Sequence, residues 1–288
     1  MRARWVCLPV AVTAAAAATI MLVAPAGAAA DTSYVALGDS YTSASLVSPS
    51  ASGAPADCTQ SAVNYPHLTA QALGLQLHDV SCGGATVSNM TTAQFSDQPP
   101  QFTALSSSTS VVTIGIGGND NNAFITAVAE CGLVDLGNVL DLGAPCQQIF
   151  GAGLTQDVTS DAPNIGAALQ RIHQLSPNAK VFVVGYPDIL PQQGRCYPTI
   201  PLSTGDVAFL NSFEKQLNSM LQTEAQANGD TFVDTYTPSI GHDACQAPGV
   251  RWVEPLIPNN AAPIHPNTAG EAADAHDVEA AMSAAGIG

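Results

Sequence analysis

Four short motifs carry a serine, a glycine, an asparagine and a histidine, which are residue types that can supply a nucleophile, oxyanion donors and a general base. Ser40 ends a Gly-Asp-Ser turn after an apolar run, where a serine hydroxyl is well placed to act as a nucleophile. Gly84 lies in a glycine-rich turn whose N–H groups could approach a ligand closely, and Asn119 could aim its amide at a developing oxyanion. His265 stands in a proline-bounded loop before a predicted helix, as a stiffly held general base should.

Each motif alone also has an ordinary structural interpretation. Gly-Asp-Ser and Gly-Gly are common turns, an asparagine often caps a helix, and a loop histidine is usually solvated. His242 is a second loop histidine that could compete with His265 for the role of base. Asp39 is expected to order the turn and to take no part in the chemistry. The prediction of an active site therefore depends on the four motifs meeting in space.

Hydrophobic periodicity predicts the elements that would bring these motifs together. A first strand is expected from residue 33 to the Gly-Asp-Ser turn, and four more are expected over 77–81, 111–115, 181–185 and 231–235. Helices are expected over 65–74, 164–175, 205–227 and 266–285. This alternation predicts an α/β fold, a three-layer α/β/α sandwich around a five-stranded parallel sheet. Right-handed crossovers would place the carboxyl ends of all strands, and with them the motifs, at one edge.

Residues 121–161 do not fit this alternation, because they are additional to the number of residues that a crossover connection between two strands needs. Their apolar middle, bracketed by Cys131 and Cys146, could line an acyl pocket or form a disulfide-stapled structural excursion.

Residues 1–30 have the pattern of a signal peptide, which leaves 31–288 as one domain. Arg2 and Arg4 precede a nearly continuous apolar run and small-residue cleavage sites, so a secreted product is expected. A membrane anchor is the alternative interpretation. The apolar run is broken by Pro25 and no second span follows, so no stable anchor is expected.

The six cysteines of residues 31–288 predict three disulfides, because an even number in an exported chain is typical of a disulfide framework. Sequence alone allows fifteen pairings. Sequential pairing is favoured, since each bridge would pin a loop beside a strand end; it joins Cys58 to Cys82, Cys131 to Cys146 and Cys196 to Cys245.

The charge balance restricts the possible partners. The chain has 7 Lys and Arg against 23 Asp and Glu, a formal charge of −16 that becomes −18 once Arg2 and Arg4 leave with the signal peptide. This argues against nucleic acid and against electrostatic docking on anionic lipid, but not against an uncharged acyl substrate. No cysteine spacing is typical of zinc, so no metal and no other cofactor is expected. A monomer is the default expectation.

Taken in order, the four motifs resemble the SGNH (GDSL-type) hydrolase family. The blocks are Gly-Asp-Ser after the first strand, Gly-Ala-Thr after the second, Gly-Gly-Asn-Asp after the third and His-Pro-Asn before the last helix. The resemblance covers essentially all of residues 31–288 and implies a flavodoxin-like fold. The cysteine layout and the stretches 241–245 and 251–253 look like the secreted actinobacterial lipase and esterase branch.

This resemblance implies a role for each motif. Ser40 would be the nucleophile, and His265 the general base and then the acid. The N–H groups of Ser40 and Gly84 and the side-chain amide of Asn119 would hold the oxyanion.

One position departs from the family pattern. Many members carry an aspartate three residues before the histidine, where this chain has Ala262. A Ser–His dyad is therefore expected, with the carbonyl of Ala262 or Pro263, or one nearby, orienting the imidazole. A carboxylate from elsewhere, Glu254 or Asp243, is the alternative.

Together these features predict a secreted serine esterase or lipase that cleaves fatty-acyl esters, glycerides or phospholipids through an acyl-enzyme. A small-acyl or carbohydrate esterase is the alternative within this class. A secreted binding module that kept the fold and lost turnover is the alternative from another class, although the presence of all four site residues argues against it.

Overall fold

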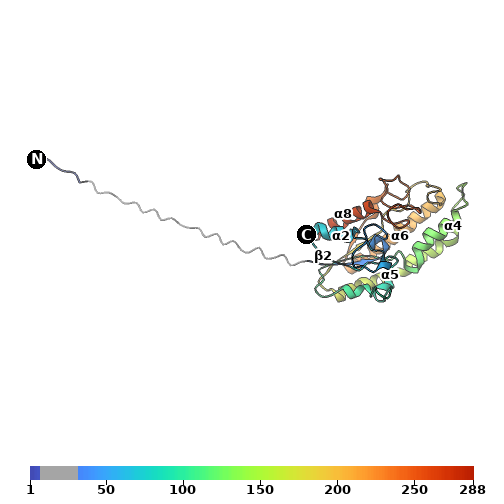
Figure 1. Cartoon of the computed structure of the whole chain (residues 1–288), viewed down its shortest axis with the longest axis horizontal. Coiled ribbons are helices and arrows are strands. Elements are labelled where there is room, and N and C mark those ends of the chain that lie inside the picture. The colour runs from blue at the N-terminus through green and yellow to red at the C-terminus, as the bar shows by residue number, and fades with distance from the viewer. Residues whose placement is uncertain (7–31) are drawn as a thin grey trace. The chain divides into compact units, whose positions relative to one another are not determined.

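Five parallel strands form the central sheet of the protein (Figure 1). The computed structural model describes residues 1–6 and 32–288, without the side chain of Ile125, so residues 7–30 of the predicted signal peptide lie outside the described residues. The chain divides into the units Met1–Ala30 and Asp31–Gly288, and the sheet belongs to the second. Its strands are β1 (Ser33–Gly38), β2 (Gln76–Asp79), β3 (Val111–Gly115), β4 (Lys180–Val184) and β5 (Thr231–Val233).

The strand order β2-β1-β3-β4-β5 with every pair parallel confirms the predicted α/β fold. This order places β1 and β3 side by side in the middle, with Gly38 opposite Gly115 at their carboxyl ends. The loops that carry Ser40 and Asn119 leave the sheet at these two neighbouring ends. That arrangement is the crevice in which flavodoxin-like sheets bind their ligands.

Alternate strand residues enter two separate cores, one on each face of the sheet. Val35, Leu37 and Ile114 pack on the side of α5 (Pro145–Leu175) and α6 (Thr204–Asn228). Tyr34, Ala36 and Val111 pack on the opposite side. There α2 (Tyr65–Leu73) and α8 (Thr268–Ala284) lie against each other (Figure 1). These two helical layers and the sheet make the predicted three-layer sandwich.

The remaining helices are short and lie in the connections. They are α1 (Ser40–Ser43), η1 (Ala56–Cys58), η2 (Val87–Met90), η3 (Gln101–Ala104), η4 (Asp120–Asn122), α3 (Ala123–Ile125), the π-helix η5 (Thr126–Glu130), α4 (Cys131–Asp135) and α7 (Tyr236–Ser239). None of the helices among the described residues combines the length and the apolarity needed to cross a membrane.

The predicted start of a helix at residue 164 is wrong, because α5 begins at Pro145 and continues through Pro163. A proline inside a helix removes one hydrogen bond and usually ends or kinks it. Pro163 is exposed, so solvent can satisfy the carbonyl left free. The buried stripe continues on both sides of it, with Val158 before and Ile165 after, both packed in the core shared with α6. Tertiary packing thus outweighs the local cost of the proline.

Two helix ends follow the local signals closely. Gly74 closes α2 at a positive φ of 65°, and Gly229 closes α6 at a φ of 80°, both in the region that glycine adopts readily. The last helix begins two residues later than predicted, at Thr268. Its first N–H groups are satisfied by Asn267, whose side chain accepts from Ala269 and Gly270. The histidine loop is therefore anchored directly to a capped helix.

All three predicted disulfides are present. Cys58 pairs with Cys82 just after β2, and the Gly83 N–H donates to the Cys58 carbonyl at 2.9 Å, so this bridge fixes the turn that contains Gly84. The other two bridges join the starts of α4 and α5 and the loops that follow β4 and α7; they are Cys131–Cys146 and Cys196–Cys245.

Candidate active site

Ser40 is the first residue of α1 and is 7% exposed. Asp39, immediately before it, caps this short helix by accepting from the Tyr41 N–H at 2.9 Å. Gly38 allows the sharp exit from β1, because a Cβ there would collide with the Thr42 side chain and lie 2.7 Å from the Gly115 carbonyl. The position also has a positive φ, which a side chain would disfavour. The turn thus holds the serine hydroxyl at the carboxyl end of the sheet.

His265 contacts this hydroxyl directly. Its Nε2 lies 2.7 Å from the Ser40 Oγ, and its Nδ1 lies 2.7 Å from the Pro263 carbonyl oxygen. A carbonyl can only accept, so Nδ1 carries the proton and donates to Pro263, which leaves Nε2 as the acceptor for the serine O–H. This is the tautomer that a general base needs.

The loop holds the imidazole through Ile264, the residue before it. Ile264 has a φ of 60°, a left-handed conformation that is strained for a β-branched residue. Its carbonyl accepts from the Tyr41 hydroxyl at 2.6 Å, and its N–H donates to the Glu254 carbonyl at 3.0 Å. The Tyr41 ring packs against the His265 ring, with 4.7 Å between the centroids. The residues that follow the serine therefore also position the histidine.

Burial lowers the pKa of His265 below its ordinary 6.5, and the hydrogen bond to Pro263 acts in the opposite direction. Desolvation disfavours the charged imidazolium, so the neutral form is the one present at pH 7. A neutral Nε2 beside the hydroxyl is consistent with a base in its resting state.

The two carboxylates considered as alternative orienting groups are occupied elsewhere. The Glu254 carboxylate accepts from Arg251 Nη2 at 2.8 Å, and the Asp243 carboxylate accepts from the Cys245 N–H at 2.9 Å. His242 stacks on Trp252 with 3.8 Å between ring centroids, and its contact is the Val250 carbonyl. The group that touches His265 Nδ1 is the Pro263 carbonyl.

Asn119 and Gly84 lie together on the loops after β3 and β2. The Asn119 amide donates to the carbonyl of Ala85 at 3.0 Å, which joins the asparagine to the residue after Gly84. Gly84 has a φ of 76°. Among the described residues, neither the Ser40 N–H nor the Gly84 N–H has a hydrogen-bond partner. Free backbone donors beside a nucleophile are the groups that can hold an oxyanion.

A buried network that sequence reasoning missed links the serine turn to the asparagine loop. The Tyr186 hydroxyl donates to Asp39 Oδ2 at 2.6 Å and accepts from the Gly118 N–H at 2.9 Å. Gln101 pins the same turn, since its side chain bonds both the N–H and the carbonyl of Gly38. Tyr186 lies two residues after the end of β4, and this position beside a strand end was the signal that could have identified it. Gln101 offered none, because it lies in a connection far from any motif.

Asp39 is fully buried inside this network. Burial raises its pKa to about 7, while the hydrogen bonds from Tyr186 and Tyr41 act in the opposite direction. The aspartate contacts tyrosine and backbone donors, which fits its predicted role in ordering the turn.

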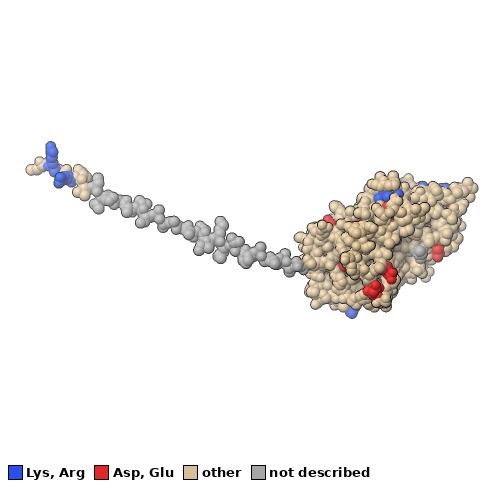
Figure 2. Space-filling model, in the orientation of Figure 1, with Lys and Arg blue, Asp and Glu red and all other residues tan. Residues whose placement is uncertain are grey.

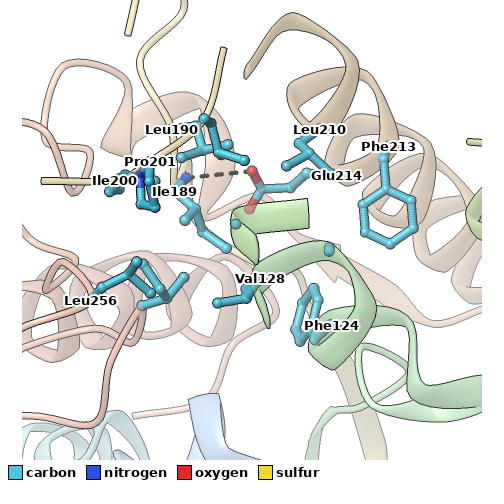
Figure 3. Close-up of a pocket in the computed structure, with 14 residues that line it drawn as sticks. Phe124, Val128, Ile189, Leu190, Ile200, Pro201, Leu210, Phe213, Glu214 and Leu256 are labelled. Atoms are coloured by element: carbon cyan, nitrogen blue, oxygen red, sulfur yellow. Dashed lines mark hydrogen bonds between the residues drawn. The ribbon is translucent and has the colours of Figure 1, made fainter. Parts of the chain in front are cut away.

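An apolar pocket is lined by residues that are neighbours or contacts of the serine and histidine loops (Figure 3). It encloses about 530 Å³ of unfilled space, part of which is open to solvent. Ile264 lines it next to His265, and Phe124 lines it while packing on Tyr41 at 5.5 Å. Phe124, Val128 and Gly132 all come from the predicted extra segment 121–161. The start of this segment therefore forms one wall of a pocket in helical form, whereas Gly132 is, among the residues that the structure describes, the one lining residue from the cysteine-bracketed middle.

The described geometry is that of a serine hydrolase: a flavodoxin-like sheet with a Ser–His pair at the carboxyl ends of its strands. The sequence profile of the GDSL-like Lipase/Acylhydrolase family matches residues 36–273. The chain belongs to this family and is a carboxylic ester hydrolase, as the resemblance implied.

Curated relatives and solved structures agree with this assignment. The chain is 40% identical to Lipase 2 of Streptomyces coelicolor over 254 residues, which covers 86% of this chain and 85% of that protein. It is similar to the crystal structure of phospholipase A1 from Streptomyces albidoflavus NA297, with a TM-score of 0.71, 28% identity and coverage of 87% and 99%. The extracellular lipase from Streptomyces rimosus gives a TM-score of 0.68 and 25% identity with the same coverage.

Proposed function

We propose that the protein is a secreted lipase or esterase that hydrolyses fatty-acyl esters through an acyl-enzyme on Ser40. The observation that carries this proposal is the 2.7 Å contact between His265 Nε2 and Ser40 Oγ, with Nδ1 held by the Pro263 carbonyl. A serine becomes nucleophilic when a positioned base takes its proton, and this geometry supplies the base in the required tautomer.

The reaction proceeds in two halves. His265 takes the Ser40 proton as Oγ attacks the ester carbonyl, and the carbonyl oxygen becomes an oxyanion. The intermediate then expels the alcohol, which receives the proton from the imidazolium, and the acyl group stays on Oγ. Water then attacks the acyl-enzyme with His265 as base, and the acid leaves as Ser40 regains its proton.

Three donors would stabilise the oxyanion in both halves: the N–H groups of Ser40 and Gly84 and the amide of Asn119. The two free N–H groups and the Asn119–Ala85 hydrogen bond support this assignment. Donors fixed before the reaction need no reorganisation as the charge develops, which is why such groups contribute strongly to rate.

The Pro263 carbonyl takes the position that a carboxylate occupies in a Ser-His-Asp triad. A neutral carbonyl fixes the tautomer and the ring orientation through its hydrogen bond, and it gives less charge stabilisation to the imidazolium than a carboxylate would. We therefore assign a Ser–His dyad, in keeping with the alanine at position 262.

The pocket and its surroundings support an apolar acyl group as substrate. The lining is almost entirely apolar, and the neighbouring stretch between Cys131 and Cys146 exposes several large apolar side chains. These are Leu133, Leu136, Val139, Leu140 and Leu142, each at least 58% exposed. The face of the unit Asp31–Gly288 drawn in Figure 2 is mostly uncharged. Burial of a fatty chain against the apolar lining of the pocket is favoured by the removal of apolar area from water.

Secretion is supported by the three disulfides, which persist in oxidising compartments, and by the signal-peptide pattern of residues 1–30.

A series of p-nitrophenyl esters of rising chain length tests the proposal, with Ser40→Ala as the control. We expect kcat/KM to rise from acetate to medium and long acyl chains and to be lost in Ser40→Ala, whose melting temperature should stay unchanged. Highest activity on acetate would favour the small-acyl alternative. No turnover of any ester by the folded wild type would refute the proposal.

A further inference from the structure

Glu214 is the one ionisable side chain among the described residues that line the apolar pocket. It lies on α6 and is only 4% exposed. Its spacing of four residues from Leu210 and three from Leu217 places it within the inward apolar stripe of this helix. A leucine would suit that stripe, so the carboxyl is a departure from the pattern that the packing favours.

One oxygen of this carboxyl has no partner. Oε2 accepts a long hydrogen bond of 3.4 Å from the Ile189 N–H, whereas Oε1 is buried without a hydrogen-bond partner among the described residues. In Figure 3 the carboxyl lies between Leu190 and Leu210, and the oxygen that is not bonded to Ile189 turns into the cavity. A buried polar atom left unpaired is costly and calls for a specific explanation.

The state of this carboxyl follows from its surroundings. Burial raises the pKa of Glu214 well above 4.5, and the negative charge of Asp188 raises it further, while the Ile189 N–H and Lys215 act in the opposite direction. Both of the effects that raise the pKa favour the neutral, protonated form of the carboxyl. Because Oε2 accepts from an amide, the proton lies on Oε1, which makes that atom a donor facing an apolar space.

The pocket lining includes Ile264 and Phe124 but neither member of the dyad, and we infer from these two residues that an acyl chain attached to Ser40 would pass this donor. Ile264 borders both the pocket and His265, and Phe124 packs on Tyr41 beside the serine. We propose that Glu214 selects acyl chains that carry an oxygen part-way along their length, a hydroxyl or an oxo group, by donating the Oε1 hydrogen to that oxygen. This inference rests on the proposed function, since it requires the acyl group of the ester to occupy the pocket.

The experiment compares p-nitrophenyl dodecanoate with hydroxy and oxo derivatives of equal length in which the oxygen is moved one carbon at a time. At one or two neighbouring positions the wild type should hydrolyse both derivatives with a kcat/KM about tenfold above that of the plain ester, the size expected of one buried hydrogen bond. Glu214→Met, similar in length and without a donor, should lose this preference and gain activity on the plain ester. Glu214→Gln keeps an N–H donor and should retain the preference. Glu224→Gln, the same chemical change on the same helix outside the pocket, is the matched control and should behave as wild type.

The outcomes separate the inference from the function on which it rests. The role of Glu214 would be overturned if the wild type hydrolysed every substituted ester with a kcat/KM within threefold of that of the plain ester. It would also be overturned if an active Glu214→Met kept the wild-type preference. Faster hydrolysis of hydroxy but not oxo derivatives would overturn the assignment of Oε1 as donor. Turnover of p-nitrophenyl acetate shows that a variant is folded. If Glu214→Met does not turn over p-nitrophenyl acetate, the role of Glu214 is judged from the kcat/KM ratios of the wild type alone. Absence of all ester turnover in the wild type would instead refute the proposed function.

Discussion

The Ser40–His265 centre is held by polar contacts, whereas the pocket wall formed by residues 121–161 is held by apolar ones. The centre is held by buried polar contacts, among them those of Asp39 and Tyr186, and each partner is fixed within hydrogen-bond distance. The wall is helical and apolar, and its outer stretch exposes leucines such as Leu140. Hydrogen bonds are directional and define geometry, whereas apolar contact scales with area and tolerates variation.

This difference separates two properties of the enzyme. Changes at the polar centre should alter kcat for every ester, because the same carbonyl chemistry occurs with each. Changes in the apolar wall should alter the dependence on acyl-chain length and leave the chemistry of short esters intact.

Loss of the Asn119 amide should have the largest effect. Asn119→Ala should lower kcat by on the order of 10²–10³ for short and long esters alike, because one oxyanion donor is removed. Asn121→Ala is a matched control on the same loop, since that side chain bonds the Asp157 carbonyl outside the centre. A decrease of less than about threefold would remove Asn119 from the oxyanion site.

The pH dependence should reflect the burial of His265. Its pKa is lowered from 6.5, so the active neutral form should persist below that value, and kcat/KM should then fall about tenfold per pH unit. Asp39, with a pKa of about 7, titrates nearby, and Asp39→Asn should leave the low-pH inflection in place. An inflection at or above pH 6.5 in both proteins would contradict the desolvated environment of the histidine.

The exposed leucines should affect long substrates alone. Replacing Leu133, Leu140 and Leu142 together by serine should reduce kcat/KM for long-chain esters by about fivefold, since apolar area for the chain is lost. Hydrolysis of p-nitrophenyl acetate is the internal control and should stay unchanged. Equal losses on both esters would mean that the wall and the centre are not separable.

The smallest effect is expected from restoring the family's aspartate. Ala262→Asp should change kcat by less than about threefold, because His265 Nδ1 already donates to the Pro263 carbonyl. Ala262→Asn controls for the added bulk at this buried position. A gain of tenfold or more for the aspartate alone would mean that the carbonyl orients the imidazole poorly.

The sequence predicted those features that local chemistry determines. The β-branched run of β3, the glycines that end α2 and α6 and the motifs that follow the strands all leave short-range signals, and the strands fall within two residues of their predicted bounds. The start of α5 was missed because the local signal of Pro163 opposes the packing that carries the helix through it.

The supporting residues of the centre could not be predicted, because their function arises from contacts between distant segments. Tyr186 lies 147 residues from Asp39 in the chain, and Gln101 lies 63 residues from Gly38. The spacing of Glu214 places it within the inward stripe of α6, but its position beside the pocket depends on the distant segments that complete the lining. Spacing along the chain carries no information about such pairs.

The central claim is that His265 activates Ser40 as a nucleophile. Mass spectrometry after treatment with a fluorophosphonate measures this directly, because the reagent bonds covalently to an activated serine. We predict one adduct per chain, on the peptide that contains Ser40, formed rapidly in the wild type and very slowly in folded His265→Ala. An adduct on another serine, or equal labelling of Ser40 with and without His265, would contradict the account.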